Sequence, residues 1–283
     1  MTDAPYALLE RIEPGIARLL APNPSPFTFM GTQTYFAGEE EVIVVDPGPD
    51  LPEHFAAIVA AVGKRRVVAI ACTHTHRDHS PASRALAAAT GAPIVGCAAL
   101  ALESVGPRAD ASFDFDYSPD RVLEDGEAIE VDGHAFEAVA TPGHTSNHLC
   151  FAYRGALFTG DHVMGWSTTV VVPPDGDMGA YMASLDKLRG RDDRVFYPAH
   201  GPAVTKPQQL VRGMMGHRLQ RERQILKRLE AGDRTVSEIV ALAYPGLDPR
   251  LVPAAGGSVT AHLLDLVRRG LVERGEDETW TSA

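Results

Sequence analysis

Three histidines and an aspartate stand within six positions of the chain, from His74 to His79 in the segment THTHRDHS. The apolar run VVAIACT precedes them and is typical of a short buried strand, so these side chains should project from the loop that follows it. Neutral imidazole and carboxylate are ligands that Zn²⁺ takes in roughly tetrahedral geometry. A solvated turn does not require this density of imidazoles, and the cluster therefore indicates a metal site.

Three later segments each place one further candidate ligand beside a glycine. TPGHTSNH carries His144, FTGDH carries Asp161 and YPAHG carries His200, and each follows an apolar run. Glycine lets the backbone turn sharply, which would bring ligands from separate strands together. Neither His148 nor His162, in the same segments, is interpreted as a ligand. His148 is interpreted as a structural histidine, with a substrate contact as the alternative, and His162 as a polar neighbour of the site.

The elements that must position these residues alternate between strands and helices. FTFMGTQTYFAGEEEVIVVD predicts two strands joined by a turn at Gly38–Glu39, and LPEHFAAIVAAVG and PASRALAAATG predict helices. Short strands with glycine turns from Arg121 to Phe158 predict a meandering sheet. A helix over Met178–Leu188 and the strand RVFYPAH follow. This alternation predicts an α/β fold with layered sheets and helices.

The composition changes after HGPAVTKP, where the chain becomes helical and rich in arginine. We place the domain boundary there, with a catalytic domain over 1–204 and a C-terminal domain over 205–283. The second domain should contain a long helix over Leu210–Glu230, a helix opened by Thr235, and a third helix over SVTAHLLDLVRRG. Two short strands about a Gly-Glu-Asp turn end the chain, and the whole predicts a small winged-helix-like domain.

The ordered set H-x-H-x-D-H, TPGHT, GD and AHG resembles the metallo-β-lactamase superfamily, over roughly residues 15–203. The resemblance implies a four-layer αββα sandwich with two Zn²⁺ ions at one edge, between the sheets. It assigns three ligands to each ion: His74, His76 and His144 to one, and Asp78, His79 and His200 to the other. Asp161 would bridge both ions, and Asp46 in VVDPGP would brace the site from outside the ligand set.

The resemblance also implies a zinc-dependent hydrolase. A water held between two zinc ions is acidified toward a pKa of about 7, which gives a metal-bridging hydroxide at neutral pH without a protein base. Asp78 would hold and aim this hydroxide, which makes it the candidate catalytic residue. The expected reaction is attack on an electrophilic carbonyl or phosphorus, and so cleavage of an ester-type bond.

The sequence indicates the substrate less clearly than it indicates the metal site. A metallo-β-lactamase core followed by a long helix and a winged-helix-like end resembles the β-lactamase-like protein 2 group, whose animal member is a single-strand endoribonuclease. This resemblance favours an RNA phosphodiester. The alternatives are a glyoxalase II-like thioester or lactone hydrolase with at most weak β-lactamase activity, and a nucleic-acid-binding regulator acting through the C-terminal domain. The net charge of −11 weighs against nonspecific binding of nucleic acid.

Two loops could contact the substrate. The segment HVMGWSTTVVVPPDGDM follows the bridging aspartate, and its candidate contact residues are Trp166, Ser167, Thr168 and Thr169. A purely structural loop is the alternative. The segment NPSPFTFMGTQTY could form the opposite wall, where the residues of an apolar lip, or otherwise of the core, are Phe27, Phe29 and Met30.

The three cysteines, Cys72, Cys97 and Cys150, lack paired spacing, as expected in a reducing cytoplasm. The first residues do not read as a signal peptide, and no apolar run approaches the roughly 18 residues of a membrane span. We therefore expect a cytoplasmic protein that acts on a small molecule or on single-stranded RNA and has no membrane partner. The C-terminal domain is interpreted as a structural cap over the mouth of the site, or as a dimerising one that would form a homodimer.

Overall fold

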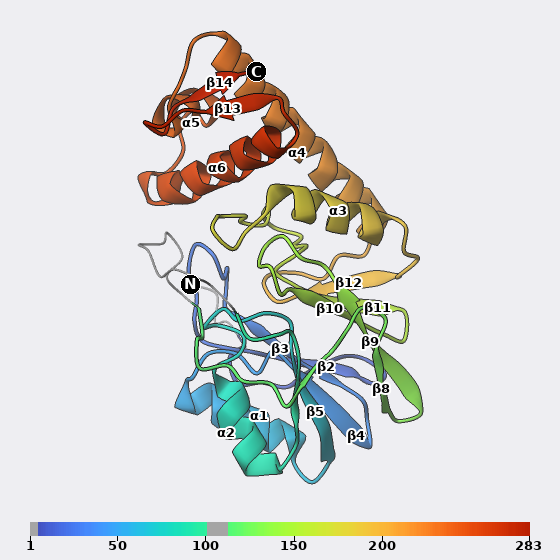
Figure 1. Ribbon diagram of the computed structural model, residues 1–283. Helices are drawn as coiled ribbons and strands as arrows, with labels where there is room; N and C mark the ends of the chain where they lie inside the picture. Colours follow the sequence, from blue (N-terminus) through green and yellow to red (C-terminus); the bar gives the residue numbers. More distant parts are fainter. Residues whose placement is uncertain (1–4, 101–112) are drawn as a thin grey trace.

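The computed structural model describes residues 5–100 and 113–283. Two β-sheets lie face to face in its larger part, and helices cover their outer faces (Figure 1). The strands of the first sheet, in hydrogen-bonded order, are β1 (Glu10–Glu13), β2 (Ile16–Leu20), β3 (Gln33–Ala37), β4 (Glu41–Val45), β5 (Arg66–Cys72), β6 (Ile94–Gly96) and β7 (Arg121–Val122). Those of the second, also in order, are β12 (Val195–Pro198), β11 (Ala156–Gly160), β10 (Leu149–Tyr153), β9 (His134–Ala140) and β8 (Ala128–Val131).

Helices α1 (Pro52–Val62) and α2 (Ala82–Thr90) cover the outer face of the first sheet, as Figure 1 shows. Helix α1 begins with Pro52, which lacks the amide hydrogen that a first turn leaves unpaired, and ends at Gly63 with φ +61°. Its buried residues His54, Ile58 and Val62 recur every fourth position, so one stripe of the helix faces the sheet.

Helix α3 (Met178–Arg189) covers the outer face of the second sheet (Figure 1). Asp177 caps this helix by accepting a hydrogen bond from the amide of Ala180. Between the sheets, the ring of Tyr35 on β3 packs 5.1 Å from that of Phe158 on β11, and its hydroxyl donates to the Pro198 carbonyl at 2.7 Å. The predicted four-layer αββα sandwich is confirmed.

The directions of the strands bring several strand ends to one edge of the sandwich. Strands β4 and β5 are parallel, and β11 and β12 are parallel. Strand β9 is antiparallel to β10, and β10 to β11, so β9 runs in the same direction as β11. The carboxyl ends of β9, β11 and β12 therefore meet at one edge of their sheet, and loops that follow them can converge there.

The C-terminal part of the chain contains α4 (Pro207–Glu230), α5 (Val236–Ala243), the 3₁₀ helix η1 (Pro249–Leu251), α6 (Val252–Arg268), β13 (Val272–Arg274) and β14 (Trp280–Ser282). These elements have a core of their own, which includes Ile225, Leu263 and Trp280. The predicted winged-helix-like arrangement is confirmed, and Thr235 and Glu238 form a reciprocal capping box at the start of α5. Helix α4 begins near the boundary predicted between residues 204 and 205, and it runs past α3 (Figure 1).

One hairpin and the starts of two elements differ from the sequence-based expectations. The hairpin β1–β2 was not expected, since ERIE and IARLL are short and mix charged with apolar residues. Strand β3 begins at Gln33 and not at Phe27, because the segment before it turns at Phe29 with φ +56°. Helix α6 begins at Val252 and runs through the glycine pair before Ser258, where a Cβ on Gly257 would lie 2.7 Å from both methyl groups of Val172. Helix α6 thus needs glycine to approach the larger domain.

None of the helices in the described part of the chain is long and apolar enough to cross a bilayer.

Candidate metal centre

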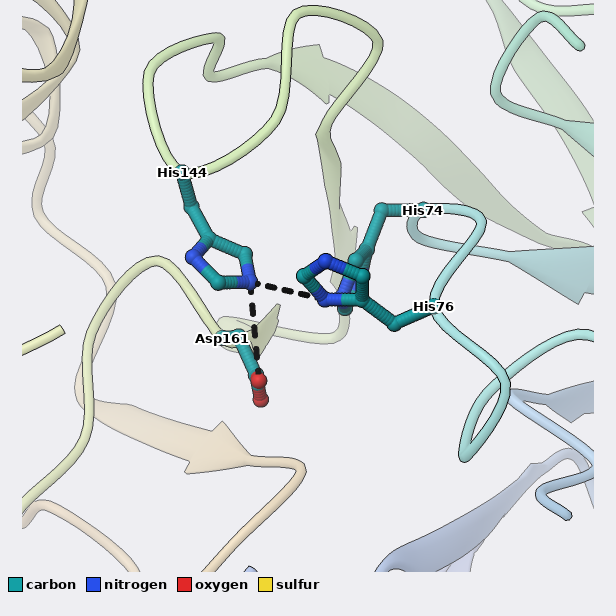
Figure 2. A group of neighbouring side chains, drawn as sticks. All are labelled: His74, His76, His144 and Asp161. Carbon is teal, nitrogen blue, oxygen red and sulfur yellow. Dashed lines mark hydrogen bonds and ion pairs between the residues drawn. The ribbon is translucent and has the colours of Figure 1, made fainter. Parts of the chain in front are cut away.

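The seven predicted ligands lie together where strand ends from the two sheets meet. His74, His76, Asp78 and His79 follow β5, His144 follows β9, Asp161 follows β11, and His200 follows β12. They form two groups whose ligand atoms lie within 4.8 Å of one another: His74, His76, His144 and Asp161 in one, and Asp78, His79 and His200 in the other. Figure 2 shows the first group, with the three imidazoles and the carboxylate pointing toward one another.

The spacing inside the first group fits a tetrahedral metal. His76 Nδ1 lies 2.9 Å from His74 Nε2 and 3.1 Å from His144 Nε2. His144 Nε2 lies 3.7 Å from Asp161 Oδ2. Ligand atoms at 2.0–2.1 Å from a tetrahedral Zn²⁺ are about 3.4 Å apart, a value that these distances bracket.

The second group is built in the same way, and Asp161 of the first group lies next to it. Asp78 Oδ2 lies 3.3 Å from His79 Nε2 and 3.2 Å from His200 Nε2. Asp161 Oδ1 lies 3.2 Å from His200 Nε2 and 3.7 Å from His79 Nε2. Because its other oxygen faces His144, Asp161 presents one carboxylate oxygen to each group.

Two atoms of the cluster test whether it fits a cation. His79 Nε2 and Asp161 Oδ1 are fully buried and have no hydrogen-bond partner among residues 5–100 and 113–283. Buried polar atoms are nearly always hydrogen-bonded, so such atoms call for an explanation. Coordination to a metal ion would satisfy both, and the donor set of imidazoles and carboxylates therefore fits a metal centre.

Asp46 lies outside the ligand set and holds one ligand in place. Its Oδ2 accepts a hydrogen bond from His79 Nδ1 at 2.9 Å and another from the Thr73 hydroxyl at 2.7 Å, and its Oδ1 accepts one from the Thr73 amide at 2.8 Å. A proton fixed on Nδ1 leaves Nε2 of His79 free to bind a metal. Asp46 has φ +47°, a left-handed conformation that aspartate tolerates better than most residues.

Other ligands have similar partners that the sequence did not reveal. The Val170 carbonyl accepts from His144 Nδ1 at 2.6 Å, and the Thr73 hydroxyl lies 2.9 Å from His74 Nδ1. The hydroxyl of Thr32 donates to Asp78 Oδ2 at 3.1 Å. Main-chain carbonyls and threonine hydroxyls carry no sequence signal for this role, which only the folded geometry reveals.

The electrostatics of the cluster favour bound positive charge. Burial alone would raise the pKa of Asp161 and Asp78, but the histidines around them outweigh burial and hold both pKa values well below the usual range. Burial disfavours the charged form of His200, yet these two carboxylates raise its pKa to about 10. Burial holds the pKa of His74 well below its usual value and lowers that of His144 to about 4. The carboxylates therefore attract a cation, and metal binding there would release protons.

Two glycines are required where ligand loops leave their strands, as the sequence predicted. Gly143, before His144, has φ +138°, and a Cβ there would lie 2.3 Å from the Cα of Tyr181. Gly160, before Asp161, has φ +49°, and a Cβ there would lie 2.7 Å from the ring of His148. Any larger residue would displace the ligand that follows.

His148 and His162 lie beside the cluster and belong to neither ligand group. His148 is buried and accepts a hydrogen bond at Nε2 from the amide of Asp161 at 3.3 Å, so it supports the ligand loop. The buried ring of His162 packs between those of His148 and Tyr181, with centroids 5.7 and 4.7 Å away. Burial lowers the pKa of His162 to about 3, so this ring stays neutral.

A cavity of about 510 Å³ opens over the metal centre. His76, Asp78, His144, Asp161 and His200 form its floor. Three of the four residues predicted to contact substrate line it: Trp166, Ser167 and Thr168. Thr169 does not, because its buried hydroxyl lies 2.8 Å from the Asp161 carbonyl and 2.9 Å from that of His162.

The apolar lip predicted opposite this loop is formed in part. Phe27 lines the cavity with 49% of its surface exposed. Phe29 packs on Trp166, with ring centroids 5.0 Å apart. Met30 is not among the residues that line the cavity, and its carbonyl accepts a hydrogen bond from Tyr6. Of the three predicted lip residues, Phe27 therefore lines the cavity, and Phe29 supports Trp166 of the facing loop.

The C-terminal domain supplies part of the cavity wall. Arg250 of η1 and Pro253 and Ala254 of α6 line it, together with Arg77 between two of the ligands. None of these residues was a candidate from the sequence, since DPRLVPAAGG stands before the predicted third helix and carries none of the motifs identified there. Their role depends on how the second domain packs on the first.

Comparisons with known families match both parts of the chain. The model of the metallo-beta-lactamase superfamily matches residues 27–200, and that of the beta-lactamase associated winged helix domain matches residues 235–280.

Individual relatives agree with these matches. A "Beta-lactamase-like protein 2 homolog" from Caenorhabditis elegans is 32% identical over 281 residues, which cover 96% of this chain and 90% of that protein. An "Atrochrysone carboxyl ACP thioesterase" from Aspergillus chevalieri is 34% identical over 253 residues, 83% of this chain and 75% of that protein.

Solved structures show the same fold. A beta-lactamase domain protein from Burkholderia ambifaria has a TM-score of 0.82 at 18% identity, covering 100% of this chain and 96% of that one. A further structure, described as a di-iron-bound form, has a TM-score of 0.51 at 25% identity, covering 66% of this chain and 94% of that one. With a family model that spans more than half of its length and a predicted set of ligands gathered at one edge, the chain belongs to the metallo-β-lactamase superfamily and carries the winged helix domain associated with it.

Proposed function

We propose that this protein is a dinuclear zinc hydrolase that cleaves the thioester or a related ester of an acyl group with an apolar body. The superfamily consists generally of hydrolases, and the ligand cluster forms the floor of a cavity large enough for such a group. The observation that carries the proposal is the character of the walls above that floor. The apolar side chains there are Pro26, Phe27, Met164, Trp166, Val170, Val172, Pro253 and Ala254.

Zinc is proposed from the donor set, in which five imidazoles and two carboxylates fall into two groups, with Asp161 of the first group also lying next to the second. When bound, the ions would polarise the carbonyl of the substrate and lower the pKa of a water molecule. Imidazole also suits iron, and one similar protein was solved with two irons, so iron must be measured beside zinc.

The chain's own residues would position the reactants. Asp78 faces the cavity with about a quarter of its side chain exposed (23%), and Thr32 donates to its Oδ2. As an acceptor held in this orientation, the carboxylate can align the attacking water. Trp166 and Phe27 would hold the acyl body and keep bulk water away from the reacting carbonyl.

This proposal ranks a thioester above the RNA phosphodiester that the sequence favoured. Proteins that bind single-stranded nucleic acid use a positively charged groove that follows the backbone. Among residues 5–100 and 113–283, the lysine or arginine residues that line the cavity are Arg77 and Arg250, and the chain carries a net charge of −11. Several of the curated relatives are named as ACP thioesterases, which supports the same choice.

We also propose that the protein acts in the cytoplasm on a small or carrier-bound acyl substrate. Its three cysteines are buried and unpaired, which suits a reducing compartment.

A side-by-side substrate screen tests the function. Zinc-loaded protein would be assayed on an acyl-pantetheine thioester, an acyl-glutathione, a lactone, a chromogenic bis-phosphate ester, single-stranded RNA and a β-lactam. The control is Asp161→Ala, which removes the carboxylate that presents an oxygen to each group. We expect the fastest turnover with acyl-pantetheine, lost in the control. Faster cleavage of RNA than of any thioester, also lost in the control, would overturn the proposed substrate.

A further inference from the structure

Arg218 carries a charge in an unusually buried position. It lies on α4, in the part of the chain that follows the catalytic domain, yet only 4% of its surface is exposed. Burying a guanidinium costs free energy unless polar groups compensate the lost water. The groups that surround it therefore indicate what the residue does.

The contacts of Arg218 come from three separate elements. Its Nη2 donates to the carbonyl of Thr169, in the loop 161–177 between β11 and α3, and its Nη1 donates to the Ser258 hydroxyl on α6 at 3.3 Å. The guanidinium carbon lies 5.3 Å from the ring centroid of Tyr181 on α3. Within the described part of the chain no carboxylate forms an ion pair with Arg218, so a carbonyl, a hydroxyl and a ring compensate its charge.

Thr169 and its neighbour Val170 each form a hydrogen bond with one of the predicted metal ligands. The hydroxyl of Thr169 contacts the carbonyl of Asp161 at 2.8 Å, and the carbonyl of the next residue, Val170, accepts from His144 Nδ1 at 2.6 Å. Asp161 and His144 are the two ligands of the first group that come from the second sheet. A shift of residues 169–170 would therefore move the backbone of one ligand and release the ring of the other.

Tyr181 connects Arg218 to the same loop by a second route. Its hydroxyl donates to the carbonyl of His162 at 3.1 Å, and His162 follows Asp161 directly. The Thr169 hydroxyl also reaches this carbonyl, at 2.9 Å. Arg218 thus fixes both the loop and the tyrosine that together hold the turn after Asp161.

We propose that Arg218 is a positioning residue through which α4 and α6 hold His144 and Asp161 in their metal-binding orientation. The C-terminal domain then has two roles, since it lines the cavity and also sets the affinity of the metal centre. This inference does not depend on which substrate the protein cleaves.

The test is zinc affinity, measured by competition with a fluorescent chelator on the full-length protein. Replacement of a residue that orients a metal ligand typically costs about 10–100-fold in metal affinity, and we expect Arg218→Met to weaken binding by about ten-fold. The absorption spectrum of the cobalt(II)-substituted protein should shift as well, because the ligand geometry changes. Arg218→Lys keeps the charge but lacks the planar fork that reaches both Thr169 and Ser258. Its zinc affinity should therefore lie between those of the wild type and Arg218→Met.

Arg221 provides a matched control on the same helix. It also donates to a backbone carbonyl, that of Ala243, and lies over an aromatic ring, that of Tyr244 at 3.7 Å, but both partners belong to the C-terminal domain. Arg221→Met should therefore lower the thermal stability without changing zinc affinity or the cobalt spectrum. Unchanged affinity in Arg218→Met, or an equal loss in both variants, would overturn the proposal. If Arg218→Met does not fold, Arg218→Lys decides, and wild-type affinity in that variant refutes the positioning role.

Discussion

Replacing Asp46 by asparagine should weaken zinc binding while the protein stays folded. The two oxygens of Asp46 accept three hydrogen bonds, two from Thr73 and one from His79 Nδ1. Asparagine has one oxygen and one NH₂ group, so it can no longer accept all three. If its oxygen faces the Thr73 amide, its NH₂ group faces His79, which must then accept at Nδ1 and carry its proton on Nε2.

That tautomer blocks the nitrogen of His79 that lies 3.3 Å from Asp78 and faces the second ligand group. Loss of such a partner costs about 10–100-fold in metal affinity, or about 1.4–2.8 kcal/mol. The same change should lower the free energy of unfolding of the metal-free protein by about 1–3 kcal/mol, because buried donors lose a charged acceptor. Chelator competition measures the first quantity, and urea unfolding the second.

Asp193→Asn is the control for this prediction. Asp193 is equally buried, and it accepts from Arg191 at 2.6 and 3.0 Å. It stands before β12, whereas His200 follows that strand, so the variant should lose stability but keep its affinity for zinc. If Asp46→Asn binds zinc as tightly as the wild type, the role assigned to Asp46 is wrong.

Three further predictions concern the cavity wall and the second domain. Arg250→Glu should raise KM about ten-fold for thioesters that carry a carboxylate or phosphate, because it introduces charge repulsion at the cavity mouth. KM for neutral thioesters should stay unchanged, and equal changes for both classes would refute this prediction. Trp166→Ala removes a large apolar surface, so kcat/KM for aromatic acyl groups should fall at least about ten-fold in steady-state assays, with zinc content unchanged. Burial lowers the pKa of His262 to about 3, so the stability gained by keeping it neutral is complete above the unfolded value of about 6.5 and is lost as the pH falls toward 3. Between about pH 7 and pH 5, the free energy of unfolding, measured by urea titration, should therefore fall by about 2 kcal/mol less in His262→Leu than in the wild type. Identical falls in the two proteins would contradict this assignment.

The residues on the floor of the site could be predicted because local sequence patterns mark them. Each of His144, Asp161 and His200 follows an apolar strand and adjoins a glycine, and this pattern can be recognised in the sequence without knowledge of the tertiary fold. The same local logic predicted that a helix opens at Thr235, and the structure confirms this start and adds a capping box with Glu238. Local signals of this kind fix both an element and its end.

The walls and supports could not be predicted, since they depend on contacts between distant segments. Arg250 lies far along the chain from the strands that carry the ligands, and the Val170 carbonyl belongs to a loop without a motif. The predicted third helix began only after the glycine pair of α6, and the packing of Gly257 against Val172 explains why glycine stands inside the helix. Long-range packing overrides local propensity at these positions.

The cavity joins parts of the molecule that can change separately. Its ligand floor comes from strand ends of the two sheets, while Arg250, Pro253 and Ala254 come from a domain with its own apolar core. Substitutions at the start of α6 can therefore reshape the entrance without touching a predicted ligand, so the same ligand floor could be combined with entrances of different size and charge. An engineer seeking a new substrate should vary η1 and the first turn of α6, and keep Arg218 and Gly257 fixed so that the C-terminal domain keeps its place over the ligand cluster.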